Sequence, residues 1–528
     1  MDPVSATVIL GDEPLTIEQV VAVARSLPPG QPHLGEAVVV QLSPGAWERV
    51  RHTRGVIEGL AHDTVAHYGI STGFGALATM HIPTEKRHQL QRSLIRSHAA
   101  GAGPEVEREV VRALMLLRIQ TLATGRTGIR EETLRAYVAM LNAGISPIVH
   151  EYGSLGCSGD LAPLAHCALA LMGEGRVHDA SGATVPAAVA LAAAGIDPVD
   201  LAEKEGLALI NGTDGMLGML CMAIADLRAL VTVADLAAAM SVEGLMGTDD
   251  VFAADLQALR PQPGQALSAA NMRKVLAVSG IRDSHREPHA CTRVQDAYSL
   301  RCAPQVAGAV RDTIDHAARV AGWELASAVD NPVVTLDGRV ESNGNFHGAP
   351  IAYVLDFLAI AAADLAGISE RRTDRFLDTS RNHGLNAFLA DDPGVDSGLM
   401  IAQYTQASMV SDMKRLAVPA SVDSIPSSAM QEDHVSMGWS AARKLRRSID
   451  ALTQVLAIEL LTAARGIQQR APLVPSPVSA AVIGALDEVT RTAPGPDRVI
   501  ADDIAGAVLA VADGSVVAAA EAAAGHLN

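Results

Sequence analysis

The chain has 528 residues, with 41 basic and 59 acidic side chains and a formal net charge of −18. This length is typical of two or three domains, and the acidic balance argues against a nucleic-acid backbone as partner. Five cysteines occur without paired spacing, which indicates reduced thiols and a cytoplasmic location. The first residues, MDPVSATVILGDEPLT, lack the basic and apolar regions of a signal peptide.

Residues 1 to about 60 are predicted to form short elements and loops. Helical patterns dominate the rest of the chain. Apolar spacing predicts helices over 105–124 and 131–142, whereas 177–199 is rich in Ala, Gly and Pro and favours a surface excursion. Longer helical patterns run over 216–240, 306–328, 349–377 and 435–469. Charges such as Asp356 and Asp364 interrupt the apolar runs, so we expect no membrane span.

The fold predicted from these patterns is mainly α, with a long central helical bundle and a smaller N-terminal domain. Aromatic residues make up only 3% of the chain, and strand-like alternation is absent over most of it. Helices well beyond the usual globular length are typical of bundles. We expect the N-terminal domain over 1–213, the bundle over 214–470 and a C-terminal helical segment over 471–528.

The tripeptide Cys157-Ser158-Gly159 can make its own electrophile, which no ordinary side chain supplies. The amide nitrogen of Gly159 can attack the carbonyl carbon of Cys157 and close a five-membered ring. Loss of the Ser158 hydroxyl as water then gives a methylidene-imidazolone (MIO). The bend before closure needs glycine, whereas the side chain of the first residue takes no part in the ring.

The sequence around the tripeptide predicts that it lies at a helix N-terminus, where developing negative charge is stabilised. An apolar run follows from Leu161 to Met172, with Asp160 as its N-cap and Gly173 as its C′ residue. A nucleophile elbow is excluded because Asp160 stands where G-x-S-x-G needs glycine. A Walker loop is excluded because no G-K-[ST] occurs.

The stretch GSLGCSGDLAPLAH resembles the signature of the MIO-dependent aromatic amino acid lyases. Further matching blocks lie in one order along nearly the whole chain: YGISTGFG (68–75), SHAAG (97–101), KEGLALINGT (204–213), VQDAYSLR (294–301), NGNFH (343–347) and QEDHVSM (431–437). In detail they are most similar to the histidine ammonia-lyase branch, in the form found in actinobacteria. Cys157, Ser71 and Asn343 depart from the commoner Ala, Asn and Gly, which leaves the ring chemistry intact and the substrate range less defined.

The resemblance implies a mainly α homotetramer whose active sites are completed by neighbouring subunits, and it assigns roles to single residues. Ammonia loss needs an electrophile, a base for the β-proton and a cation for the carboxylate. Tyr68 matches the base and Arg301 the bidentate carboxylate clamp. The candidate catalytic residues are Tyr68, Cys157, Ser158, Gly159, Tyr298 and Glu432; the candidate substrate-binding residues are His98, Asn211, Gln295, Arg301 and Phe346. Taken singly, each has an ordinary structural explanation, such as a loop-packing tyrosine or a surface arginine.

His98 and Glu432 distinguish the possible substrates. A carboxylate can accept a hydrogen bond from an imidazole N–H, whereas a phenyl ring gains nothing from a buried Glu. The leading hypothesis is therefore non-oxidative deamination of L-histidine to trans-urocanate and ammonia, the first step of histidine degradation. Two alternatives are another MIO-dependent lyase or 2,3-aminomutase, and a helical scaffold in which the tripeptide never cyclises.

A cluster of possible metal ligands alternates in the polar loop over 278–292, namely His285, Glu287, His289 and Cys291. This spacing could ligate zinc if the segment were extended. A solvent-facing loop is the better interpretation, so we expect no metal and no external cofactor besides the self-made MIO.

Overall fold

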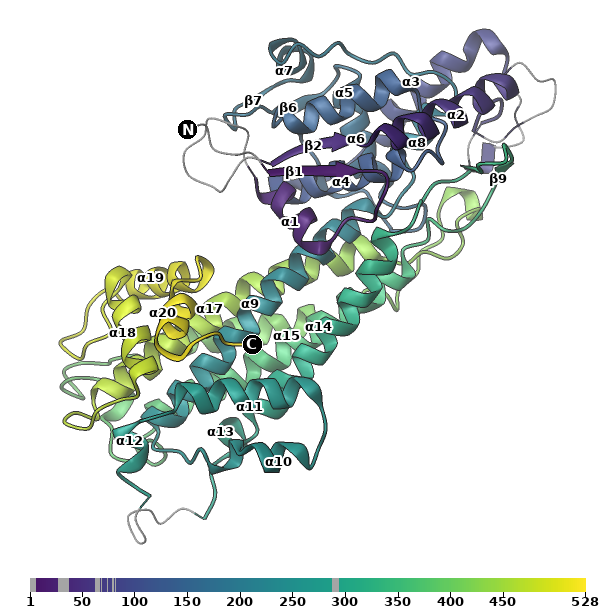
Figure 1. Ribbon diagram of the computed structural model, residues 1–528. Helices are drawn as coiled ribbons and strands as arrows, with labels where there is room; N and C mark the ends of the chain where they lie inside the picture. The colour runs from purple at the N-terminus through teal and green to yellow at the C-terminus, as the bar shows by residue number, and fades with distance from the viewer. Residues whose placement is uncertain are drawn as a thin grey trace. The chain divides into compact units, whose positions relative to one another are not determined.

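A computed structural model of the chain describes residues 6–26, 38–61, 67, 69–73, 75–77, 80, 82–286 and 294–528 (Figure 1). The chain divides into two compact units, each assembled from three segments. Unit 1 comprises 1–225, 318–356 and 419–443, and unit 2 comprises 226–317, 357–418 and 444–528. The division into three consecutive domains stays a prediction.

Unit 1 combines helices with four small sheets. Its helices are α1 (Ile17–Arg25), α2 (Pro44–Ala61), α3 (Arg87–His98), α4 (Arg108–Ala123), α5 (Glu131–Asn142), α6 (Leu161–Leu171), α7 (Ala187–Ala193) and α8 (Glu205–Ile210), with 3₁₀ turns η1 (Gly75–Leu77), η2 (Thr84–Lys86) and η5 (Ser428–Met430). Its strands are β1 (Ala6–Leu10), β2 (Val38–Leu42), β3 (Ala102–Glu105), β4 (Ser146–Pro147), β5 (His150–Tyr152), β6 (Arg176–His178), β7 (Thr184–Pro186), β8 (Val333–Val334) and β9 (Val340–Glu341). β1 and β2 pair in parallel, whereas β3–β5, β4–β6–β7 and β8–β9 are antiparallel.

Helix α4 forms the centre of unit 1, because every residue from 110 to 123 is buried. Its buried polar side chains form hydrogen bonds to main-chain carbonyl groups of other segments. Arg112 donates to the carbonyl oxygens of Val23 and Leu141 at 2.9 and 3.2 Å, and Gln120 donates to the carbonyl of Glu13 at 3.1 Å. Buried polar side chains need such partners, so these bonds fix how the surrounding loops approach the helix.

Four long helices pass from one unit into the other: α9 (Asp214–Gly244), α14 (Ala303–Leu325), α15 (Ala349–Leu377) and α17 (Gly438–Gln468). The remaining helices of unit 2 are α10 (Ala254–Ala258), α11 (Pro263–Val275), α12 (Gly280–Asp283), α13 (Tyr298–Arg301), α16 (Met400–Leu416), α18 (Pro477–Val489), α19 (Ile500–Ala512) and α20 (Ser515–Ala524), with η3 (Asp250–Phe252) and η4 (Ala387–Leu389).

Within unit 2, buried Glu459 on α17 hydrogen-bonds to side chains of two other long helices, α9 and α15. Figure 1 labels these three helices. The Glu459 carboxylate accepts from Ser241 of α9 at 2.7 Å, from Ser369 of α15 at 2.6 Å and from Arg372 of α15 at 2.8 Å. A buried charge is tolerated when it is paired and hydrogen-bonded in this way.

The mainly α fold predicted from the sequence is confirmed. The predicted helices are confirmed with end shifts of a few residues. The segment 177–199 lies mostly at the surface, as expected, and it also contains most of the β6–β7 hairpin and all of α7, with Val177 and Leu191 fully buried. Asp356 and Asp364 lie within α15, as the sequence shows, but they do not make it too polar to be a membrane-span candidate. Glu205–Gly244 and Ala349–Leu377 are long and apolar enough, by length and composition, to cross a membrane, although 78% and 61% of their most apolar windows are buried inside the protein.

Candidate active site

The tripeptide lies in a tight loop that enters α6 and contacts the link between α8 and α9. Gly159 has φ +76, and a Cβ there would stand 2.1 Å from the carbonyl oxygen of Gly212. Only glycine fits such a position. The next amide, of Asp160, donates to that same oxygen at 2.7 Å. The loop is therefore held by main-chain contacts that no larger residue at position 159 could keep.

Asp160 occupies the N-cap position of α6, as predicted, but its carboxylate makes no cap bond to that helix. Instead it accepts from the amides of Gly215 and Met216 in the first turn of α9, each at 2.9 Å, and from Ser154 Oγ at 2.8 Å. Burial raises the pKa of Asp160 to about 7, against the lowering effect of these bonds. The side chain thus joins the loop to α9. Gly173, with φ +78, follows the C-cap of α6 as predicted.

Ser158, His98, Asn211 and Glu432 come together around one cavity of about 870 Å³ in unit 1. Apolar side chains from the start of α6, from α3, from α8 and from the segment before η2 complete its walls. The lining residues are Gly73, Gly75, Leu77, Met80, Ile82, Leu90, Ser93, Leu94, Ser97, His98, Ser158, Leu161, Leu207, Ile210, Asn211, Ser428, Ala429 and Glu432. This is a mostly apolar chamber with few polar groups, the usual form of a small-molecule site.

Asn211 ends α8 and is held from behind by Arg118 of α4. The fully buried guanidinium donates to the carbonyl oxygens of Asn211 at 2.5 Å and of Val329 at 2.8 Å, and lies 3.6 Å from Asp214. By contrast, the Asn211 side-chain oxygen is buried without a hydrogen-bond partner among the described residues. A buried polar atom left unpaired is costly, and because Asn211 lines the cavity, this oxygen is available to a ligand there.

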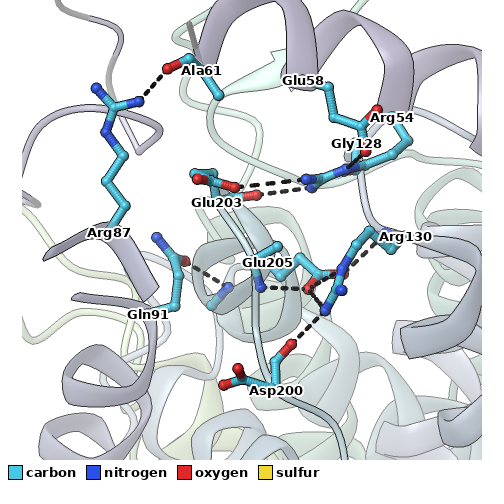
Figure 2. A network of polar contacts seen from close by, with 12 residues as sticks. Arg54, Glu58, Ala61, Arg87, Gln91, Gly128, Arg130, Asp200, Glu203 and Glu205 are labelled. Carbon is cyan, nitrogen blue, oxygen red and sulfur yellow. Dashed lines mark hydrogen bonds and ion pairs between the residues drawn. The ribbon is translucent and has the colours of Figure 1, made fainter. Parts of the chain in front are cut away.

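The start of α8 is fixed by a polar network that Figure 2 shows from close by. Arg130 contacts the Glu205 carboxylate through two nitrogens, at 2.7 and 2.9 Å, and Gln91 of α3 accepts from the Gly206 amide at 2.9 Å. Arg54 donates to the carbonyl oxygen of Glu203 at 3.1 Å. Both Arg130 guanidinium bonds end on Oε2 of Glu205, and Oε1 accepts from the Arg130 amide at 3.0 Å. Charge-assisted hydrogen bonds are stronger than neutral ones, so the short helix that carries Asn211 is held at its N-terminal end.

His98, the last residue of α3, presents a hydrogen-bond acceptor to the cavity. Its Nδ1 lies 2.9 Å from the carbonyl oxygen of Leu94. Because a carbonyl can only accept, Nδ1 carries the proton and Nε2 of the neutral ring has a free lone pair. Burial lowers the pKa of His98 below its ordinary value, although the Leu94 bond and the charge of Glu432 oppose this. The ring is therefore neutral near neutral pH.

Glu432 follows η5 and is anchored by two donors on one carboxylate oxygen. Cys157 Sγ lies 3.0 Å and Ser427 Oγ 3.2 Å from Oε2. Burial, followed by the effect of Glu432, raises the pKa of Cys157 to about 12, so the thiol keeps its proton and donates it. Among the described residues, the other oxygen, Oε1, has no such partner, and it is free to accept from a ligand.

Four of the other predicted site residues do not line this chamber. Tyr68 lies outside the described residues. Phe346 is half-buried but does not line the cavity. Gln295, Tyr298 and Arg301 belong to unit 2, where Gln295 lines a separate cavity of about 290 Å³ and the Arg301 guanidinium lies over the Tyr298 ring, 4.7 Å from its centroid.

The possible metal ligands over 285–291 are described only at His285. Its Nδ1 and Nε2 lie 3.2 Å from the carbonyl oxygens of Ile281 and Gly247. Glu287, His289 and Cys291 lie outside the described residues.

Sequence reasoning missed the residues that support the site. Arg118, Gln91 and Arg130 gave no motif, because a single Arg or Gln has no distinctive local pattern. It also missed Leu90 and Leu94, although their spacing on α3 marks an apolar helix face. The sequence assigned no role to the side chain of Cys157 or to Ser427.

Comparison with known proteins places the chain in a family. Residues 15–488 match the model of the family described as aromatic amino acid lyase. The histidine ammonia-lyase of Streptomyces griseus is 62% identical over 523 residues, 99% of each chain. The crystal structure of histidine ammonia-lyase from Trypanosoma cruzi matches with a TM-score of 0.87 and 37% identity, covering 98% of this chain and 95% of that one.

Fold alone does not separate substrates in this group. The crystal structure of tyrosine aminomutase from Streptomyces globisporus matches with a TM-score of 0.91 and 35% identity, over 99% of this chain and 100% of that one. Since one fold can host several chemistries, the substrate must be argued from the residues of the cavity. The match over residues 15–488 and the identity of 62% over 523 residues show that the chain belongs to the aromatic amino acid lyase family.

Proposed function

We propose that this chain, a carbon–nitrogen lyase, deaminates L-histidine to trans-urocanate and ammonia. One observation carries the substrate assignment: His98 Nε2 and Glu432 Oε1, two hydrogen-bond acceptors, belong to side chains that line the same cavity as Ser158. An imidazole ring bears N–H groups that can donate to such acceptors. A phenyl ring of similar size would leave both acceptors unpaired, and a phenol, with its single O–H, would leave one of them unpaired, which costs binding energy. Only an imidazolium ring supplies two N–H donors.

We infer that Cys157, Ser158 and Gly159 form an MIO group. Ring closure would join the Gly159 nitrogen to the Cys157 carbonyl carbon, and two waters would leave, one carrying that carbonyl oxygen and one carrying the Ser158 hydroxyl. The positive φ of Gly159, the place of Ser158 in the cavity wall and the unpaired Asn211 oxygen support this assignment. The group would supply an electrophile that captures the amine or the imidazole of the substrate.

The remaining roles are proposed from the match of sequence blocks. Tyr68 removes the β-proton. Asn211 holds the electrophile and the substrate from the α8 side. Phe346 packs beside the substrate ring.

The substrate carboxylate needs a cation, and no arginine or lysine occurs among the described lining residues. We propose that Arg301 supplies it, with Gln295 and Tyr298, from a neighbouring subunit of a homotetramer. Co-expression of two inactive variants, Tyr68→Phe and Arg301→Ala, should then restore some activity, because a mixed oligomer contains sites with both residues intact. Absence of recovery in verified mixed oligomers would show that one chain builds each site.

Substrate profiling tests the proposed reaction. Purified protein is incubated with each aromatic amino acid, and the conjugated acrylate is followed by ultraviolet absorbance. We expect urocanate from histidine and little product from tyrosine or phenylalanine. Faster cinnamate or coumarate formation would reject the substrate assignment, and accumulation of a β-amino acid would identify an aminomutase. We also propose a cytoplasmic location, with which the free state of Cys157, Cys167, Cys221 and Cys302 agrees.

A further inference from the structure

Glu432 depends on distant support for its orientation. Among the described residues, its main chain hydrogen-bonds only to nearby Ser427, by amide–carbonyl bonds of 2.9 and 3.3 Å. Between these two residues, Ser428, Ala429 and Met430 all adopt positive φ, from 51 to 68°. Such backbone is costly for residues other than glycine and persists only where the surroundings hold it. A carboxylate carried on this turn needs an anchor outside the turn.

Cys157 provides that anchor from 275 residues away in sequence. Among the described residues, no other side chain remote from the turn hydrogen-bonds to Glu432. Cys157 is 6% exposed, which limits the access of water to the thiol. Because the ring closure uses only main-chain atoms of residue 157, the thiol remains available to Glu432 after cyclisation.

We propose that Cys157 is a positioning residue for substrate recognition: its thiol holds Oε2 of Glu432 so that Oε1 faces the imidazole of the substrate. This inference rests on the proposed function. Cys157 would then have two roles: its main-chain atoms form part of the ring, and its thiol orients Glu432. The second role follows from the contact between Cys157 and Glu432, which the sequence around neither residue predicts.

A double-mutant cycle tests the inference, with Cys157→Ala, Glu432→Ala and the double variant assayed on histidine. We expect Cys157→Ala to lower kcat/KM by about three- to tenfold, the range for losing one weak hydrogen bond. In the Glu432→Ala background the same change should alter kcat/KM by less than about twofold, because its partner is already gone. Cys157→Ser keeps a donor and should recover at least part of the loss.

Two controls separate this role from general damage. Cys221→Ala removes another buried thiol, on α9 and outside the cavity lining, and should leave kcat/KM unchanged. Intact mass of each variant reports whether the two waters have been lost. A merely structural role for Cys157 would give equal losses in both backgrounds of Glu432.

The outcomes distinguish the inference from the function on which it rests. If the wild type loses two waters and prefers histidine, but the effects of the two substitutions multiply, the positioning role is wrong and the function stands. The positioning role is also wrong if Cys157→Ala equals the wild type, or if neither Cys157 variant loses the waters. If the wild type fails to cyclise or does not prefer histidine, both proposals are rejected.

Discussion

The two polar walls of the cavity are built in different ways. The electrophile wall, comprising Cys157–Asp160 and Asn211, is held by buried main-chain and charged contacts from α4 and α9. The recognition wall comprises half-buried His98 and Glu432, whose side chains have fewer anchors: the Leu94 carbonyl for the His98 ring, and Cys157 and Ser427 for the Glu432 carboxylate. Reaction chemistry therefore rests on the rigid interior of unit 1, whereas substrate choice rests on a few contacts that single substitutions can change.

The largest effect should follow from Ser158→Ala, which removes the leaving hydroxyl from the electrophile wall. Without it no methylene can form, and we expect turnover to fall on the order of 10⁴-fold or more while the protein stays folded. Intact mass should show that the loss of the Ser158 water is abolished. An active Ser158→Ala enzyme would reject the MIO mechanism, whatever the wild-type mass.

Arg118→Met should lower the free energy of unfolding, because Arg118 supports the same wall. It leaves the carbonyls of Asn211 and Val329 unpaired and Asp214 without its nearby cation. Removing one partner of a buried polar network costs about 3–5 kcal/mol of unfolding free energy. Denaturant unfolding measures this, with Arg415→Met as the control.

Arg415 makes an exposed ion pair with Asp412, at 2.7 Å. Such pairs contribute less than about 1 kcal/mol. Equal losses for the two arginine variants would contradict the view that Arg118 supports the electrophile wall.

Glu432→Gln should have an intermediate effect, confined to substrate choice. Loss of a charged acceptor for the imidazole costs about 1.5–3 kcal/mol, or about ten- to a hundredfold in histidine turnover if expressed fully in the transition state. Cyclisation should be unaffected, because the ring atoms lie on the other wall. The measurement compares kcat/KM for histidine and phenylalanine, and equal losses for both would show that Glu432 supports the site without recognising imidazole.

The smallest effect concerns the pH dependence that His98 contributes. The pKa of His98 lies below the ordinary value because of burial, so Nε2 is an unprotonated acceptor near neutral pH. Nε2 becomes protonated, and can no longer accept, only as the pH falls through that lowered pKa. We expect the ratio of wild-type to His98→Gln kcat/KM to fall only at pH values below the ordinary pKa of histidine. The ratio cancels the titration of the substrate itself. A ratio that is flat between about pH 5 and pH 8 would remove His98 from recognition.

Sequence alone was sufficient for features that depend on neighbouring residues. Apolar spacing located α5 and α15 to the residue, because a helix repeats every 3.6 positions whatever surrounds it. The tripeptide chemistry needs only three consecutive residues. His98 and Glu432, 334 positions apart, were linked through matched blocks and not through any local rule.

Tertiary structure alone decided which groups meet. Asp160 is a residue type that commonly caps helix N-termini, yet its carboxylate accepts hydrogen bonds from amides in the first turn of α9 and not from α6. Arg118 had no motif, yet it holds Asn211, and the Cys157 thiol lies against Glu432. These partners are far apart in the chain, and their pairing depends on how buried polar groups find partners once helices have packed. A local pattern carries no information about that choice.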